Sequence, residues 1–297
     1  MKNLIFSVVF ASLFFTSCDK KANSKEVETI IKGKVAILVD ESILPIVESQ
    51  VEVFESQYNA TITLVPESET KIAQLLSEDK NRLAIMCREL SSSESKIFKE
   101  KKINPKVTIF GTDGIAFIVN KKNTDTIINL EKFVAFMQGK NQDLFSGFVF
   151  DNANSSTVRF IKNFAKVDIL PKDKIFSLNT NNEVIDYIIN NPNKIGVIGV
   201  NWISDPMPEN AYKVKQINVL SVQLKDKTLT KPSQDNIASG TYPFKRQIKM
   251  LNYQGNSGLG MGFASFVAGD IGQRIILKSG LVPIRIPARN IKIRSKI

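Results

Sequence analysis

The stretch from Phe150 to Phe160, FDNANSSTVRF, combines residue types that could bind an anion at the start of a helix. Three hydroxyl side chains in a row, Ser155 to Thr157, open a pattern of apolar residues at helical spacing. Ser or Asn in front of such a pattern is typical of a helix N-cap. A helix N-terminus presents free N–H groups and a positive dipole end, and hydroxyls there can donate further hydrogen bonds to an anion. The alternative is that these hydroxyls only cap the helix.

The composition excludes several other kinds of chemistry. The 297 residues include no histidine, so Ser-His and Cys-His catalysis and histidine metal sites are ruled out. An S-x-x-K pattern at Ser93 to Lys96 lacks the companion motifs of the enzymes that use it. We therefore expect a protein that is not an enzyme and has no cofactor or metal. The net charge of +11 is compatible with nucleic acid, but no nucleic-acid motif accompanies it, so we expect no such partner.

The N-terminus predicts export and attachment to a membrane. Lys2 precedes a short apolar run from Leu4 to Phe15, which is typical of a secretory signal peptide and too short for an ordinary membrane span. Small residues directly before Cys18 resemble the bacterial lipoprotein box. This resemblance implies that residues 1–17 are removed, that Cys18 carries the lipid, and that residues 18–32 form a linker. The protein is then expected in the periplasm or cell envelope; a signal peptide without lipidation is the alternative.

Strands and helices alternate in the part of the chain that must position these residues. Apolar patterns predict strands near residues 35–39, 61–65 and 83–87, each followed by a helical pattern. This alternation is typical of a parallel sheet covered by helices. Ligands of such sheets bind beyond the carboxyl ends of the strands. Three polar junctions stand at such ends: Asp40 to Ser42, Arg88-Glu89, and Asn152 to Thr157.

The remaining patterns predict further elements in both halves of the chain. Cys87 ends an apolar strand-like run and is expected to be buried and inert. Helices are expected at residues 43–58, 68–76, 91–101, 130–137, 181–189, 258–268 and 271–279. Extended segments are expected at residues 107–110, 115–119, 195–200, 242–251 and 281–286.

Four short motifs occur along the chain, and together they indicate a relationship to known proteins. GTDGIAFIVN ends at Asn120, and SGTYPFKR ends at Arg246. IGVIGV lies at residues 195–200, and Gly280 to Pro283 reads GLVP. Taken together, these motifs resemble the substrate-binding proteins of phosphate-type ABC transporters, whose chain crosses between two lobes at the first two motifs. The resemblance extends over about residues 33–286.

The resemblance implies an α/β fold of the periplasmic-binding-protein type. Two lobes, each a mixed sheet flanked by helices, would be joined by a two-stranded hinge. The first lobe would comprise residues 33–112 plus 245–297, and the second residues 113–244. The lobes of this family close on one small oxyanion, phosphate above all, and present it to an ABC transporter permease. We expect a monomer with this function, bound to the membrane through its lipid anchor.

The resemblance also implies which residues line the cleft between the lobes. They come from the three polar junctions: Glu41, Ser42, Arg88, Asn154, Ser155, Ser156 and Thr157. A carboxylate of Asp40, Glu41 or Glu89 would favour monohydrogen phosphate, which can donate its proton, over sulfate, which cannot. The chain departs from the family pattern in having acids at the first junction and Ser156 in place of a glycine. A different anion, a cationic or amphoteric ligand, and a lost binding function therefore stay open as alternatives.

A second hypothesis is an envelope interaction or sensory lipoprotein that keeps the fold without transporting phosphate. The basic C-terminal tail from Arg285 to Lys296 motivates this hypothesis. Three further side chains have separate expectations. Trp202 is expected in the core, with a place over the cleft as the alternative. Arg159 is expected to face solvent, and Arg246 is placed near the hinge by family position only.

Overall fold

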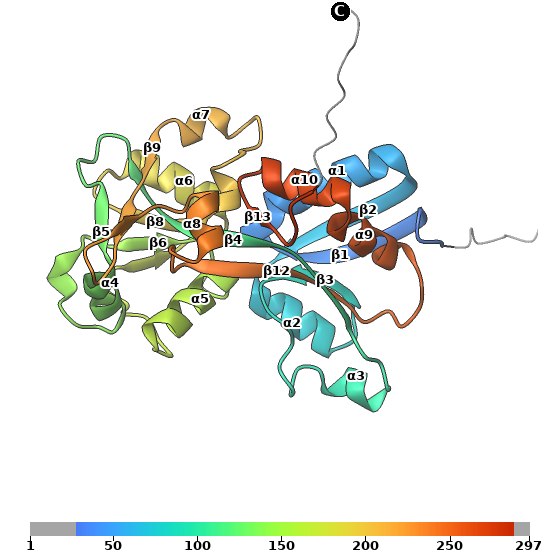
Figure 1. The fold of residues 1–297 in the computed structure, drawn as a ribbon. Coiled ribbons are helices and arrows are strands. Elements are labelled where there is room, and N and C mark those ends of the chain that lie inside the picture. The colour runs from blue at the N-terminus through green and yellow to red at the C-terminus, as the bar shows by residue number, and fades with distance from the viewer. Residues whose placement is uncertain (1–27, 288–297) are drawn as a thin grey trace, which may run out of the picture.

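The computed structural model describes residues 28–287, which form two lobes side by side (Figure 1). Cys18 and the basic residues beyond position 287 lie outside the described residues. The first lobe consists of β1 (Lys32–Asp40), α1 (Leu44–Gln57), β2 (Asn59–Glu67), α2 (Glu69–Ser77), β3 (Leu83–Met86), α3 (Lys96–Glu100), α9 (Leu259–Ala268), α10 (Asp270–Lys278) and β13 (Val282–Pro283). No helix within residues 28–287 is long and apolar enough to cross a membrane.

The second lobe is built from shorter strands and from helices that pack on them. Its elements are β5 (Ile127–Asn129), α4 (Leu130–Met137), β6 (Phe148–Phe150), α5 (Ser156–Ala165), β7 (Ile175–Ser177), α6 (Asn181–Asn190), β8 (Ile195–Gly199), α7 (Ala211–Val214), β9 (Ile217–Val219), β10 (Ser221–Gln223), β11 (Leu229–Thr230) and α8 (Gln234–Ser239). Short 3-10 turns add η1 (Glu41–Ile43), η2 (Gln142–Leu144) and η3 (Val200–Trp202).

Two long strands, β4 (Lys106–Asn120) and β12 (Lys245–Asn252), run between the lobes (Figure 1). They pair antiparallel, and the main sheet has the order β2-β1-β3-β12-β4-β8-β6-β7. The parallel pairing of β1 with β2 and β3 confirms the parallel sheet expected from the sequence. The structure has the two lobes and the two-stranded connection that the resemblance implied, while the exact lobe boundaries stay a prediction.

The structure differs from the expected elements at three places. The helix expected at residues 91–101 is only the five-residue α3, because residues 92–95 form a turn in which the Ser95 N–H donates to the Ser91 carbonyl. The segments expected at residues 107–110 and 115–119 are one continuous strand, β4. Its first half pairs with β12 and its second half pairs with β8 and β9, so the backbone of Gly111 to Gly114 stays extended between them. The strand expected at residues 281–286 is only two residues long, because β13 pairs with β4 just at Thr112 and Gly111.

A cluster of phenylalanine rings fills the core of the second lobe. Phe133 of α4 packs edge-on against Phe117, Phe148 and Phe244, with ring centroids 4.9, 5.3 and 5.6 Å away. All four rings are fully buried. Phe244 directly precedes β12, so the cluster fixes the start of this crossover strand against the lobe. Cys87 and Trp202 are also buried, as the sequence predicted.

Replacing Phe133 with alanine is expected to lower the free energy of unfolding by about 3–5 kcal/mol, because the change removes a fully buried ring and leaves a cavity. Phe176→Ala is the matched control, since that ring is 37% exposed, and it should cost less than about 1 kcal/mol. Urea unfolding followed by circular dichroism measures both. Equal effects of the two substitutions would contradict the assignment of Phe133 to the core.

Candidate ligand-binding site between the lobes

The candidate site begins where β1 ends in the first lobe. Asp40 is the last residue of β1, and its carboxylate caps the turn η1 by accepting a hydrogen bond from the Ser42 backbone N–H at 3.1 Å. On the facing lobe, Ser155 is the N-cap of α5 and accepts from the Val158 N–H at 3.2 Å. The helix start predicted from the sequence is therefore confirmed, and α5 points its N-terminus at the other lobe.

A buried relay of hydrogen bonds links the two lobes through side chains. The Arg246 Nη1 donates to Ser156 Oγ at 2.7 Å, and Ser156 Oγ lies 2.9 Å from Ser42 Oγ. Ser42 Oγ in turn donates to Asp40 Oδ1 at 3.0 Å. Arg246 Nη1 also donates to Thr157 Oγ1 at 3.2 Å. Each hydroxyl of the relay is thus bonded to a protein group in this closed arrangement of the lobes.

Arg246 is held in place by the hinge strands themselves. It stands opposite Asp113 in the antiparallel register of β12 and β4. Its Nη2 contacts Asp113 Oδ2 at 2.9 Å, and the two side chains are 2% and 0% exposed. A buried ion pair of this kind keeps the guanidinium charged and aimed between the lobes. The sequence had placed Arg246 near the hinge by family position only.

The backbone carbonyl of Ser42 is a second point of contact between the lobes. It accepts from the Asn201 Nδ2 and from the Trp202 Nε1, both at 3.0 Å. Arg246 Nη2 lies 3.4 Å from the same oxygen. Three donors from η3 and β12 therefore converge on one residue of the turn η1. Sequence reasoning missed Asn201, whose only signal is its place two residues after the Gly-rich strand β8.

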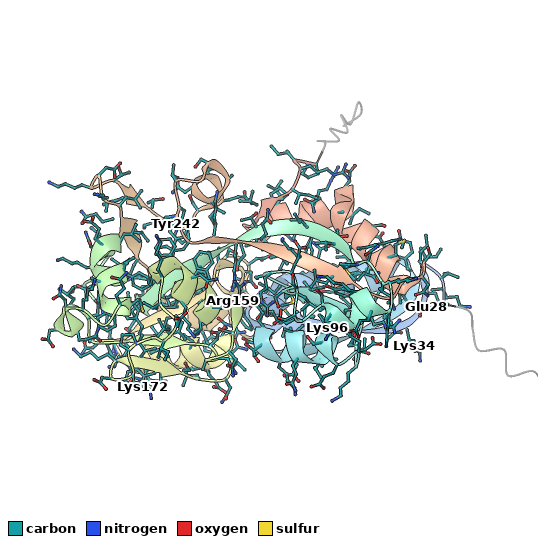
Figure 2. All side chains as sticks on the ribbon, turned by 90° about the horizontal axis from the view of Figure 1, so that it is seen from below. Glu28, Lys34, Lys96, Arg159, Lys172 and Tyr242 are labelled. Atoms are coloured by element: carbon teal, nitrogen blue, oxygen red, sulfur yellow. The ribbon has the colours of Figure 1, made fainter. Side chains whose placement is uncertain are left out.

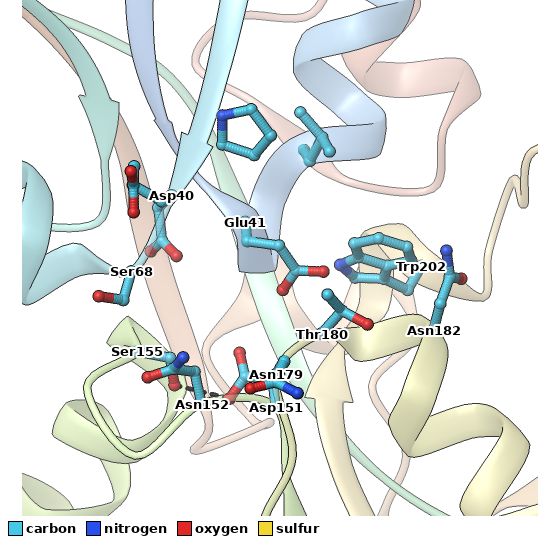
Figure 3. Close-up of a pocket in the computed structure, with 13 residues that line it drawn as sticks. Asp40, Glu41, Ser68, Asp151, Asn152, Ser155, Asn179, Thr180, Asn182 and Trp202 are labelled. Atoms are coloured by element: carbon cyan, nitrogen blue, oxygen red, sulfur yellow. Dashed lines mark hydrogen bonds between the residues drawn. The ribbon is translucent and has the colours of Figure 1, made fainter.

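A chamber of about 350 Å³ opens beside the relay, between the lobes (Figure 3). Asp40 and Glu41 reach it from the first lobe, and Asp151 and Asn152 reach it from the second. Ser155 donates to Asp151 Oδ1 at 2.6 Å along its edge. Of the described residues that line the chamber, none is lysine or arginine.

Burial shapes the acid–base behaviour of the chamber. It raises the pKa of Asp40 to about 6, helped by the nearby Glu69 carboxylate and opposed by Arg246. Burial also raises the pKa of Glu41 to about 8, although hydrogen bonds from Asn181 favour its charged form. The pKa of Asp151 is raised for the same reason. The chamber therefore gains negative charge as the pH rises through the neutral range.

The other expected site residues, Glu41, Arg88 and Asn154, do not belong to the relay of hydrogen bonds. Glu41 bridges the lobes by accepting from Asn181 Nδ2 at 2.6 Å. Asn154 is exposed and offers its backbone carbonyl to the Thr70 N–H at 3.2 Å. Arg88 donates to Glu94 at 2.6 Å, at a separate surface hollow. Whether Asn154 and Arg88 contact a ligand stays a prediction.

Arg159 differs from the sequence expectation that it faces solvent. It lies at the junction of the lobes (Figure 2) and pairs with Glu69 of α2, with Nη2 donating to Oε2 at 3.1 Å. The Glu69 side chain is only 2% exposed, and a buried carboxylate needs a cationic partner. Glu69 also accepts from Arg88 Nε at 3.3 Å. These pairs close the outer edge of the junction.

Comparison with known proteins places this geometry in a family. The family model of the PBP superfamily domain matches residues 23–270. The chain belongs to the PBP superfamily. No curated protein sequence matches it. Within residues 28–287, no group of three or more acidic, cysteine or histidine side chains is placed to hold a metal ion.

Solved structures share the fold of this PBP-superfamily chain at low identity. A candidate phosphate ABC transporter substrate-binding protein from Clostridium perfringens, with bound phosphate, is 18% identical, with a TM-score of 0.70 over 85% of this chain and 100% of that one. An ABC-type phosphate transport receptor from Vibrio cholerae is 19% identical, with a TM-score of 0.61 over 84% and 99% of the chains. A regulatory domain from Synechocystis, in complex with 2-PG, is 13% identical, with a TM-score of 0.53 over 80% and 96%.

Proposed function

We propose that this protein is a solute-binding protein, not an enzyme, that captures phosphate or a related small oxyanion between its lobes for an ABC permease. The observation that carries the proposal is the Arg246 guanidinium, which is buried at the junction and donates to the hydroxyls of Ser156 and Thr157, with the Ser42 hydroxyl beside Ser156. A guanidinium with several neutral donors is the donor set that a dehydrated oxyanion needs. Related structures from Clostridium perfringens and Vibrio cholerae carry phosphate-binding names, which supports the choice of phosphate.

The proposed mode of capture uses the movement of the lobes. When they part, the contact between Ser42 and Ser156 breaks and the Ser156 hydroxyl becomes free to donate to the oxyanion, while the Ser42 hydroxyl still donates to Asp40. Arg246 remains fixed by Asp113, so the charge is already aimed at the ligand before binding. The N-terminus of α5 adds its dipole at the same place. Closure then rebuilds the contacts of Glu69 with Arg159 and of Glu41 with Asn181 around the ligand.

The wider setting of the function is proposed from the sequence. Cys18 would carry a lipid that holds the protein at a membrane in the periplasm or cell envelope, where it would deliver its ligand as a monomer. Family membership supports a permease partner and an extracytoplasmic site. The hypothesis of a sensory or interaction lipoprotein rested on the basic tail, most of which lies outside residues 28–287 and lends it no structural support.

Thermal unfolding in the presence of anions tests the proposal. Phosphate at 100 times its dissociation constant should add about 2.7 kcal/mol to the free energy of unfolding and raise Tm by several degrees. Sulfate should give no shift, because it has no proton to donate to the Asp40 carboxylate. Ser156→Ala should abolish the phosphate shift, whereas Ser265→Ala on the exposed face of α9 should leave it intact. If millimolar phosphate leaves the Tm of the wild-type protein unchanged, the proposal is overturned.

A further inference from the structure

The chamber beside the relay is larger than a lone phosphate requires. Its volume of about 350 Å³ falls within the range of pockets that take organic ligands, roughly 300–1,000 Å³. Four carboxylates line it, those of Asp40, Glu41, Glu67 and Asp151. The lobes face each other across it, as Figure 3 shows, so a ligand there would contact both. A chamber with this lining repels a second anion.

Two buried oxygen atoms in the lining have no hydrogen-bond donor. They are Asp40 Oδ2 and Asn182 Oδ1. The Asp40 side chain is fully buried, yet only its Oδ1 is occupied, by the hydroxyl and N–H of Ser42. A buried acceptor without a donor destabilises the folded state, because the atom has lost its hydrogen bonds to water. Since both atoms are acceptors, the missing group in the chamber is a donor.

Electrostatics favour a cation as this donor. The pKa of Asp40, raised by burial, is still only about 6, so this carboxylate is mostly ionised at neutral pH. Glu41 and Asp151 are held toward their neutral forms by burial, and a nearby cation would let them ionise. The charge of Arg246 is already directed to Asp113 and the hydroxyls. The lining also includes the indole of Trp202, whose face attracts organic cations.

We propose that the chamber receives an organic ammonium group of the same ligand whose oxyanion contacts Arg246. Asp40 stands between the two places, because it lines the chamber and its Oδ1 belongs to the relay while its Oδ2 has no donor. The ligand class is therefore a phosphate ester or phosphonate that carries a primary amine a few bonds away. This inference rests on the oxyanion function proposed above and makes that function more specific.

Calorimetric titration of the full chain with two phosphate esters tests the inference. Ethyl phosphate and aminoethyl phosphate differ only by the amine, so the ratio of their affinities isolates the chamber. We expect aminoethyl phosphate to bind at least tenfold more tightly. Equal binding of the two esters overturns the inference and leaves oxyanion capture standing. Phosphate and ethanolamine are titrated as well, because each carries only one of the two groups. If ethanolamine and aminoethyl phosphate bind but phosphate and ethyl phosphate do not, oxyanion capture is overturned and the ammonium site stands. If none of the four compounds binds, both proposals fall.

A substitution at the rim of the chamber separates charge from shape. Glu67 lines the chamber at the end of β2 and is partly exposed, so Glu67→Gln keeps the shape and removes one charge. It should reduce the preference for aminoethyl phosphate over ethyl phosphate at least threefold. Glu52→Gln, on the exposed face of α1, is the matched control and should change neither affinity. An unchanged preference in Glu67→Gln contradicts an electrostatic role for the chamber.

Discussion

Arg246→Met is expected to lower the free energy of unfolding by about 3–5 kcal/mol and to abolish any response of Tm to phosphate. Methionine fills most of the arginine volume, but it leaves the Asp113 carboxylate buried and without its cation. Breaking a buried pair from one side costs this much because the remaining charge has no compensation. Urea unfolding of the purified variant measures the loss, and a phosphate titration of Tm measures the binding.

Adding Asp113→Asn separates the effect of Arg246 on stability from its effect on phosphate binding. The double variant Arg246→Met with Asp113→Asn has no unpaired buried carboxylate at this position. Most of the lost stability should therefore return, while phosphate binding stays absent. Arg82→Met is the matched control. The Arg82 side chain, which pairs with Asp79, is 37% exposed, and exposed ion pairs stabilise the folded state by about 1 kcal/mol or less. A double variant that regains phosphate binding would remove Arg246 from the proposed site.

The stability of the wild-type protein is expected to fall as the pH rises from about 4.5 to about 8. The pKa of Glu41 is about 8 in the folded chain and near its ordinary 4.5 when unfolded, so the native state binds more protons across this interval. The free energy of unfolding therefore decreases with pH, by at most about 5 kcal/mol from this residue, and levels off above the folded pKa. Asp40 adds a smaller loss of the same sign that ends near pH 6.

Glu41→Gln assigns this pH dependence to one residue. Glutamine cannot ionise but can still accept a hydrogen bond from Asn181, so the variant should be more stable than the wild type at pH 9 and similar to it at pH 4.5. Glu52→Gln, at an exposed position, should retain the wild-type profile. Urea midpoints measured every half unit of pH compare the three proteins. A profile of Glu41→Gln that overlays the wild type would show that the Glu41 carboxyl ionises normally.

Much of the fold follows from local signals in the chain. The alternation of apolar runs with helical spacing predicts the parallel strands β1, β2 and β3 and the helices between them. The cap at Ser155 is predictable because its partner, the Val158 N–H, lies three residues away. The continuity of β4 was not predictable, because Gly111 to Gly114 looks like a turn until β12 and β8 pair with the strand.

Patterns of neighbouring residues in the sequence predicted only part of the candidate site. The sequence named Ser42, Ser156 and Thr157, because they follow strand ends or begin a helix, and the structure brings these three together. It gave more weight to Arg88 than to Arg246, because Arg88 directly follows a predicted strand. The guanidinium of Arg88 instead binds Glu94, six residues along the chain, and Glu69.

The sequence by itself determined the family, the strand and helix order and the hydroxyl-rich start of α5, since these depend on patterns within a few residues. Tertiary structure alone decided which arginine enters the junction and which carboxylates surround it. Arg246 meets Asp113 across 133 positions of chain, only because the register of β4 and β12 sets them opposite each other. The acidic chamber arises in the same way, because Asp40 and Asp151 come from different lobes and face one cavity only once the lobes close.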